Sequence, residues 1–414
     1  MKRISSNLSN NDMNYYMRIR EVRMNESQNK IASESRILNL RDDPISASHS
    51  TRFKSHLFRN NRYSDNVTTL IDKYREAEGY MSSVNDILIS VRDLAVQGAN
   101  DFYSVDDRRK MAVQADQMLN ELVKISNQKS GDGSALFTGS RFFDDAFLTL
   151  EGSVEGSTWP VITKVMYNGN NNKNLVEISE NTVLAENFPG NEVFWAESQE
   201  IFSARNALDF IVSDDTSIFV DGQEIPLKSG DNIHAIIGKI NGSGISVKAS
   251  LDPVRNSFVL SGTSPHQLWL EDKQGSTVLS DLGILSDNGK PPFNYAKDAS
   301  VSGGSLFDMV IRLRDELYAG NTVQIGGGAL KGIDKAHDSL LTVMADLGSK
   351  SERLEHTQLR LDKLTPDLVQ RDSRETDINL AEAITNLKML EYTHTAALKT
   401  AARILTPTLL DYLR

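Results

Sequence analysis

This chain of 414 residues contains seven histidines, the residues whose side chains could take part in the most kinds of chemistry. Histidines bind zinc when they are closely and regularly spaced with other ligands. The histidines here show no such spacing, which favours surface, capping or interface roles and predicts no metal site. They are His49, His56, His234, His266, His337, His356 and His394. The chain has no cysteine, so disulfides, thiolate ligands and cysteine nucleophiles are excluded.

A glycine-rich run suggests a phosphate-binding loop at first sight. Residues 326–332 read Gly-Gly-Gly-Ala-Leu-Lys-Gly, which lacks the GxxxxGK[ST] order of that motif. We therefore expect a flexible linker between two helices. The adjacent carboxylates Asp42-Asp43 and Asp106-Asp107 fit helix capping better than acid–base catalysis. No GxSxG or HExxH pattern occurs, and the sequence predicts neither an enzyme nor a cofactor.

The net charge of −11 is concentrated in the middle of the chain. Residues 151–300 hold 20 Asp+Glu against 10 Lys+Arg, which leaves the two flanks nearly neutral. This balance argues against a nucleic-acid partner. Nearly neutral flanks suit surfaces that pack against many neighbours. No run of about 18 apolar residues occurs, so we expect no membrane-spanning helix. The polar start also lacks the apolar stretch of a secretory signal peptide.

Helix-breaking residues divide the chain in the same way. Seven of the ten prolines and all three tryptophans lie in the middle region. The fold class expected is a mixed α and β multi-domain protein with coiled-coil-like helical flanks and an inserted α+β, mostly β, middle domain. Three parts are predicted: terminal helices (1–40 with 377–414, disordered before assembly), a helical rod (41–150 with 301–376) and an acidic outer domain (151–300).

The rod helices are predicted from apolar residues that alternate spacings of three and four. One such stripe runs from Leu70 to Ala95 and another from Ile333 to Leu364, which is typical of coiled-coil-like packing. Asp43-Pro44 and Ser104 are expected to begin helices, the second ending near residue 129. Residues 131–148 suggest a hairpin that closes this region.

The middle region is predicted to alternate strands with one short helix. A strand over 217–220 precedes Asp221-Gly222, a strong hairpin-turn pair. Ile233, Ile236, Ile237 and Ile240 share one helical face, and strands are expected over 245–251 and 258–260.

The terminal helices carry more apolar surface than one partner helix covers. The N-terminal stripe is apolar at only half its positions, whereas two overlapping registers run along the C-terminal helix. We expect both ends to order on assembly with other chains, although packing on the body of the same molecule stays open. The predicted assembly interface consists of Met13, Met17, Met24, Ile31, Leu38, Leu380, Ile384, Leu387, Leu398, Ile404 and Leu405.

Two segments near the ends resemble bacterial flagellin-type proteins. Residues 37–48, Ile-Leu-Asn-Leu-Arg-Asp-Asp-Pro-Ile-Ser-Ala-Ser, are similar to the N-terminal signature of that family, and residues 377–385 and 404–413 to its C-terminal signature. Residues 305–319 look like the return helix of the family, and 217–284 like an insertion motif of flagellar axial proteins. The signature residues are Asn39, Asp42, Asp43 and Pro44.

Some residues depart from the family pattern or select among its members. Flagellin itself usually lacks a proline after the Asp pair, so Pro44, with the start Arg3-Ile4-Ser5, favours members at the hook–filament junction. The family often has Gly where Glu34 stands, Pro where Leu40 stands, and a polar residue where Pro407 stands. Pro407 is expected to kink the last helix.

The resemblance implies a structural adaptor of the bacterial flagellum that joins hook to filament as a short ring. Its two terminal segments would pair as inner helices of a tubular polymer after export by the flagellar type III apparatus. Implied partners are hook-associated protein 1, flagellin, copies of the chain itself and an export chaperone, with no nucleic acid and no membrane. The implied location is the flagellum, secreted outside the cell, or in the periplasm where flagella are internal.

Two alternatives stay open. The first is a flagellin-type filament subunit, which would assemble into long filaments. The second is a surface adhesin or glycan-binding module carried by residues 151–300, with a ligand held between Trp159, Trp195 and Trp269. Scattered tryptophans belong to a core more often than to a ligand platform.

Overall fold

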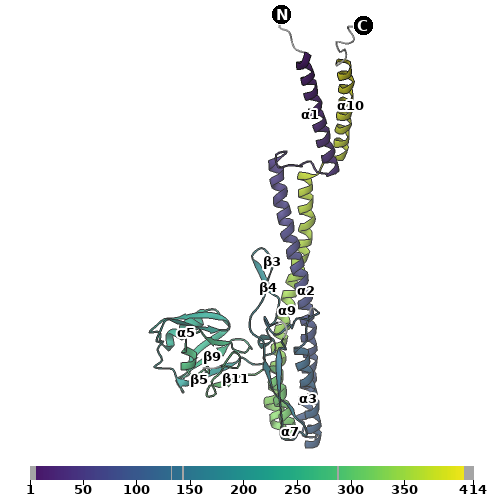
Figure 1. Ribbon diagram of the computed structural model, residues 1–414. Helices are drawn as coiled ribbons and strands as arrows, with labels where there is room; N and C mark the ends of the chain where they lie inside the picture. The colour runs from purple at the N-terminus through teal and green to yellow at the C-terminus, as the bar shows by residue number, and fades with distance from the viewer. Residues whose placement is uncertain (1–5, 132, 142–143, 287–288, 405–414) are drawn as a thin grey trace, which may run out of the picture. The chain divides into compact units, whose positions relative to one another are not determined.

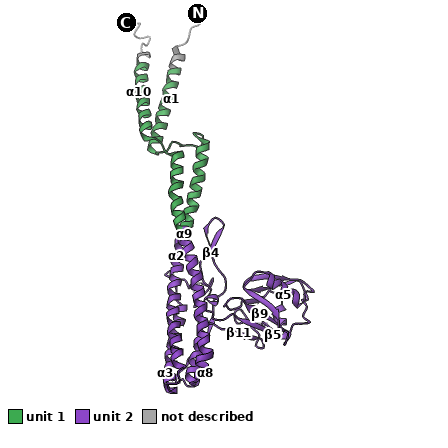
Figure 2. Cartoon of the chain, turned by 180° about the vertical axis from the view of Figure 1, so that it is seen from behind, with its two compact units in different colours: residues 1–65, 358–414 green, residues 66–357 purple. Residues whose placement is uncertain are grey.

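The computed structural model describes residues 6–131, 133–141, 144–286 and 289–404 (Figure 1). It divides into two compact units, which Figure 2 colours separately. Unit 1 comprises Met1–Asp65 and Gln358–Arg414, and unit 2 comprises Asn66–Thr357. The three-part division near residues 40, 150, 300 and 377 stays a prediction. Among the residues that the structure describes, no helix has an apolar stretch long enough to span a membrane.

Unit 1 is helical. Its helices are α1 (Ser6–Ala32), α10 (Leu380–Ile404), the first part of α2 (Pro44–Gly98) and the last part of α9 (Leu330–Thr376). Helices α1 and α10 lie side by side, as both views show (Figures 1 and 2). The start of α2 contacts the end of α9, where the Asn60 side-chain amide donates to the carbonyl oxygen of Leu361 (2.9 Å) and to Thr365 Oγ1 (2.8 Å).

A left-handed residue ends α1. Glu34 has φ 52°, the Glu34 N–H donates to the carbonyl of Ile31, and the Ser35 N–H donates to that of Lys30. This pair of bonds is a Schellman motif, in which glycine is the usual left-handed residue. Glycine would adopt the positive φ at this position with less steric cost than Glu34 does.

Unit 2 contains the rest of the two long helices together with α3 (Val105–Ser126), α7 (Leu306–Ala319), α8 (Thr322–Gln324) and a π-helical turn η1 (Ile325–Ala329). The stripe from Leu70 to Ala95 is buried, as predicted. The second stripe is buried or half-buried from Ile333 to Leu361, but Leu364 is 42% exposed and does not extend it. Capping boxes at Ser104 and Ser305 begin α3 and α7.

The glycine run is helical, so the prediction of a flexible linker was wrong. Residues 325–329 form the π-helical turn and α9 begins at Leu330. An added Cβ at Gly328 would lie 2.6 Å from Nη2 of Arg312, and one at Gly332 would lie 2.6 Å from Sδ of Met309. The glycines therefore admit α7 side chains close to the helix backbone, which explains a run that otherwise disfavours helix.

Two small hairpins lie between the helices in sequence. Strands β1 (Phe147–Gly152) and β2 (Val161–Tyr167) pair antiparallel, and so do β3 (Leu175–Ser179) and β4 (Thr182–Ala185). The predicted hairpin over 131–148 was wrong. In the described part of that range, bends and turns follow a single β-bridge between Lys129 and Ala135.

An α+β lobe (residues 200–302) follows the short helix α4 (Gly190–Val193). Its four-stranded sheet has the order β11-β5-β9-β8, and its three-stranded sheet the order β10-β6-β7. The elements are β5 (Glu200–Asn206), β6 (Thr216–Val220), β7 (Gln223–Leu227), α5 (Ile233–Gly242), β8 (Val247–Leu251), β9 (Ser257–Gly262), β10 (Leu270–Asp272), α6 (Val278–Asp281) and β11 (Ser300–Ser302). Asp221 and Gly222 have positive φ angles and form the predicted β6–β7 turn.

Candidate assembly interface

The predicted N-terminal stripe lies on one face of α1. Met13, Met17, Met24 and Ile31 recur at helical spacing and are half-buried, whereas most neighbouring side chains are exposed. Because α1 packs on α10, this face is the one turned toward its partner. Arg20 on the same face donates from Nη1 to the carbonyl oxygen of Thr393 (3.2 Å).

The two registers of α10 have different surroundings. The first is buried or half-buried, at Ala383, Leu387, Leu390, His394, Ala397 and Ala401. The second register shares Leu387, His394 and Ala401 with the first, but its other apolar members that the structure describes are exposed: Leu380 is 43% exposed, Ile384 44% and Leu398 46%. The structure therefore separates the predicted C-terminal residues into Leu387, which faces α1, and an uncovered apolar flank formed by Leu380, Ile384 and Leu398.

The other predicted interface residues lie outside this helix pair. Leu38 is 36% exposed in the connection between α1 and α2. Ile404 ends α10, and its side chain, together with all of Leu405 and Pro407, lies outside the described residues. The expected kink at Pro407 consequently stays a prediction.

A groove of about 460 Å³ lies between the two terminal helices. Its lining residues are Met13, Tyr16, Met17, Arg20, Tyr392, Thr393, Ala396, Ala397 and Thr400. Tyr16 and Tyr392 are 61% and 77% exposed at this groove. The sequence analysis missed both tyrosines because neither belongs to the apolar registers, although each is a large aromatic residue on an otherwise polar face.

The family signature forms the entry to α2. Asp42 Oδ2 accepts from the N–H groups of Leu38 (3.1 Å) and Asn39 (3.0 Å), and Asp43 Oδ1 accepts from that of Ser46 (3.1 Å). These backbone hydrogen bonds hold the pKa of Asp42 and Asp43 below the usual value for aspartate. Pro44 is the first residue of α2, where a missing N–H is harmless.

Arg36 connects the two halves of unit 1. Its Nη1 donates to Asp43 (3.0 Å), and its Nη2 donates to Ser46 Oγ (3.2 Å) and to the carbonyl of Glu375 (2.9 Å). Beside it, Ser35 and Asp377 form an antiparallel bridge. We call residues 34–36 with 375–378 the clasp. Helical periodicity gives no signal for such a contact, since the clasp residues lie between helices.

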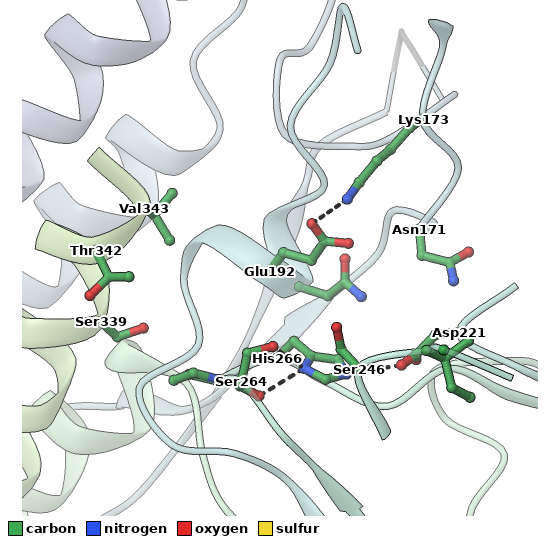
Figure 3. A pocket seen from close by; sticks show the side chains of 14 residues that line it. Asn171, Lys173, Glu192, Asp221, Ser246, Ser264, His266, Ser339, Thr342 and Val343 are labelled. Carbon is green, nitrogen blue, oxygen red and sulfur yellow. Dashed lines mark hydrogen bonds and ion pairs between the residues drawn. The ribbon is translucent and has the colours of Figure 1, made fainter. Parts of the chain in front are cut away.

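A polar pocket of about 440 Å³ lies in unit 2 (Figure 3). His266 is buried there, with Nε2 3.0 Å from Asp221 Oδ2 and Nδ1 2.8 Å from the carbonyl oxygen of Ser264. Burial alone would lower the pKa of His266, but the hydrogen bond and charge of Asp221 outweigh it and raise the pKa. Lys173 and Glu192 form a second ion pair in this pocket (2.7 Å). Both pairs are structural contacts.

The remaining candidate chemistry does not converge on a site. His49 contacts Glu375, and His337 contacts Asn85. Within the ranges that the structure describes, no three His, Asp or Glu side chains gather as metal ligands would. Trp195 and Trp269 are 8% and 7% exposed and Trp159 is 54% exposed.

Comparison with known proteins shows what the chain is similar to. Residues 4–141 match the family model described as the bacterial flagellin N-terminal helical region. The sequence resemblance to flagellin-type proteins is therefore confirmed for this N-terminal part of the chain. Flagellin A of Vibrio cholerae is 25% identical over 405 residues, which cover 93% of this chain and 91% of that protein.

Other known proteins are similar over part of their length or at low sequence identity. The flagellar filament 31.3 kDa core protein of Treponema maltophilum is 30% identical over 156 residues. That alignment covers 38% of this chain and about half (53%) of the Treponema protein. The solved flagellar hook-associated protein-3 of Legionella pneumophila gives a TM-score of 0.44 at 17% identity, covering 83% of this chain and 99% of that one. The solved structure of Xanthomonas campestris FlgL gives a TM-score of 0.46 at 14% identity, and the match covers 78% of this chain and 99% of that one.

Proposed function

We propose that this protein is a structural adaptor at the hook–filament junction, acting as hook-associated protein 3. The main observation in support of this proposal is that the apolar flank of α10, formed by Leu380, Ile384 and Leu398, is not covered by α1. Full burial of a Leu or Ile side chain is worth about 1.5–3 kcal/mol, so the half-exposed flank leaves binding energy for other subunits. The Asp42-Asp43-Pro44 entry to α2 supports the junction protein over flagellin.

The proposed assembly is a short ring. Its surface includes the α1 stripe, the α10 flank, Leu38, Ile404 and Leu405. The proposed neighbours are hook-associated protein 1 on one side, flagellin on the other, and further copies of the chain within the ring. Export with the help of a chaperone would deliver the protein to a flagellum outside the cell or in the periplasm. The role is mechanical and involves no catalysis.

A substitution in the terminal pair tests this function. Leu387→Asp places a carboxylate against α1 and should abolish incorporation into the flagellum while unit 2 stays folded. Leu387→Ala is the matched control that removes volume without charge. Incorporation is measured by blotting purified flagella, and folding by circular dichroism. Normal incorporation of Leu387→Asp would show that this face of α10 is not part of the assembly interface.

Deletion of the gene distinguishes a junction protein from a filament subunit. Cells without the protein should make hooks that lack filaments and should release flagellin into the medium. Intact filaments in those cells would contradict the junction role. The full-length match to Vibrio cholerae Flagellin A keeps the filament subunit as a second candidate. Growth of the purified chain into long filaments would support that candidate instead.

A glycan-binding module receives less support from the tryptophans. Trp269 donates from Nε1 to Glu271 (2.7 Å) within the lobe, whereas Trp195 forms a bridge with Ser305. Both are buried, so neither offers the exposed ring face on which a sugar stacks. A glycan screen with the full chain tests this alternative, and binding that is lost in Trp159→Ala would revive it.

A further inference from the structure

The first 21 residues of α2 are basic in an acidic protein. Residues 44–64 contain no Asp or Glu, but they contain Arg52, Lys54, Arg59 and Arg62. The chain as a whole has a net charge of −11. Lys54 lies 3.8 Å from Asp372 on α9, so this cation is paired within the molecule.

The three arginines lie on a different side of α2 from the α9 contact. Arg52, Ser55, Arg59 and Arg62 follow spacings of three, four and three, which place them on one face of a helix. All four are exposed. In the described part of the chain, none of the three guanidinium groups forms an ion pair with a carboxylate. We call these four residues the basic face.

The basic face borders a shallow groove of about 470 Å³. The groove is lined by Leu40, Pro44, Ser48, Thr51, Arg52, Ser55, His56 and Arg59. Arg59 Nη2 lies 3.0 Å from Nδ1 of His56, which fixes one edge of the groove, and Leu40 is 74% exposed. Cations, hydroxyl groups and one apolar side chain together suit a protein surface that carries carboxylates.

We propose that the basic face binds an acidic surface of a second copy of this chain, which rests on the ring assembly proposed above. The charge needed is present in the same chain, because residues 151–300 carry an excess of ten acidic residues. Three unpaired arginines on one helix face repel one another, and carboxylates from a neighbour would relieve that repulsion. Complementary charge also fixes the register of neighbouring subunits.

Cross-linking in the assembled flagellum identifies the neighbour. The chain has no cysteine, so Ser55→Cys gives a single labelling site at the centre of the basic face. With a benzophenone maleimide on that cysteine, illumination of purified flagella should give a dimer of this chain, joined to a peptide rich in Asp and Glu. Lys124→Cys, an exposed position of α3 outside both proposed surfaces, is the control position. A cross-link to a different flagellar protein, or none, would overturn the proposal.

Charge reversal supplies the second test. R52E/R59E/R62E should reduce the amount of protein in purified flagella at least tenfold, while R52K/R59K/R62K should assemble normally. K124E/K331E/R353E changes the net charge by the same amount at exposed positions of unit 2 outside residues 151–300 and should have no effect. Circular dichroism of each full chain checks folding. Normal incorporation of the triple-glutamate variant would refute the docking role.

Two further outcomes separate this proposal from others. If Leu387→Asp blocks incorporation and the triple-glutamate variant does not, the junction function stands and the basic face fails. If both incorporate normally, the proposed function fails as well. Sedimentation with phosphatidylglycerol vesicles tests a membrane partner. If the wild type sediments with the vesicles, the triple-glutamate variant does not, and both are incorporated equally into flagella, the basic face binds lipid and not a protein.

Discussion

Arg314 on α7 donates from Nη1 to Oδ1 of Asp116 on α3 over 2.9 Å, and the arginine side chain is completely buried. The same nitrogen donates to the carbonyl oxygen of Ile162 on β2 (2.6 Å). Nη2 of Arg314 also lies 2.8 Å from the partly exposed carboxylate of Asp315. One cation therefore joins three elements that are far apart in sequence.

Removing the buried carboxylate should destabilise unit 2. Asp116→Ala leaves the Arg314 charge with less compensation in the core, and we expect the free energy of unfolding to fall by about 3 kcal/mol. Denaturant titration followed by circular dichroism measures the change. Asp72→Ala is the matched control, because Asp72 forms an exposed i,i+3 pair with Arg75 and should change stability by less than about 1 kcal/mol. Equal effects of the two variants would contradict a special role for the buried pair.

Glu34, the left-handed residue at the end of α1, can be replaced by a residue that fits this conformation better. Glu34→Gly should stabilise the clasp by about 0.5–1 kcal/mol, because glycine adopts a positive φ without steric cost, whereas Glu34→Val should weaken it. Hydrogen exchange at the Ile378 amide, which donates to the Glu34 carbonyl over 3.1 Å, reports on this region. Slower exchange in the glycine variant is expected. Faster exchange would mean that the Glu34 side chain itself supports the clasp.

Two glycines should respond in opposite directions to alanine. At Gly327 an added Cβ meets nothing within 4 Å, so Gly327→Ala should stabilise the helix by about 0.5–1 kcal/mol. At Gly303, with φ 86°, the Cβ would lie 2.6 Å from the carbonyl oxygen of Ser198. Gly303→Ala should cost roughly 1–3 kcal/mol through strain and overpacking. Thermal melts of the two variants provide the comparison, and a stabilising Gly303→Ala would contradict the backbone geometry.

The stability of the lobe should depend on pH through His266. Its pKa is raised in the folded state, so folded protein binds the proton more tightly than unfolded protein does. The stabilisation is complete below the unfolded pKa of about 6.5 and is lost as the pH rises through the higher folded pKa. His266→Gln should remove this part of the dependence. Denaturant midpoints across the range from pH 5 to 9 measure it, and an unchanged profile would exclude His266 as the source.

The long helices could be predicted because one physical rule dominates them. Alternating spacings of three and four put Leu70 to Ala95 on one face, and every residue of that stripe is buried. The Asp221-Gly222 turn was equally clear, since few residue pairs adopt two successive positive φ angles. The helical glycine run could not be predicted, because its cause is the approach of Arg312 and Met309 from another helix.

The candidate interface was predictable only in outline. Periodicity identified both registers of α10, but it could not tell which of their residues face α1, since Leu387 and Leu398 have the same apolar character in sequence. The clasp was beyond prediction, because Arg36 contacts Glu375 across 339 positions of the chain without any repeating pattern. The basic face was visible as an acid-free stretch, yet only the positions of Lys54 and Asp372 show which cations are already paired.

The clasp also sets an order of events during synthesis. The bridge from Ser35 to Asp377 and the packing of α1 on α10 join segments that lie far apart in the sequence. A ribosome makes α10 (Leu380–Ile404) long after α1 (Ser6–Ala32), so α1 lacks this partner until the chain between them has been synthesised. Contacts of such high sequence separation require closure of the longest loop and form slowly. While the intervening chain is made, α1 therefore stays available to whatever binds nascent chains.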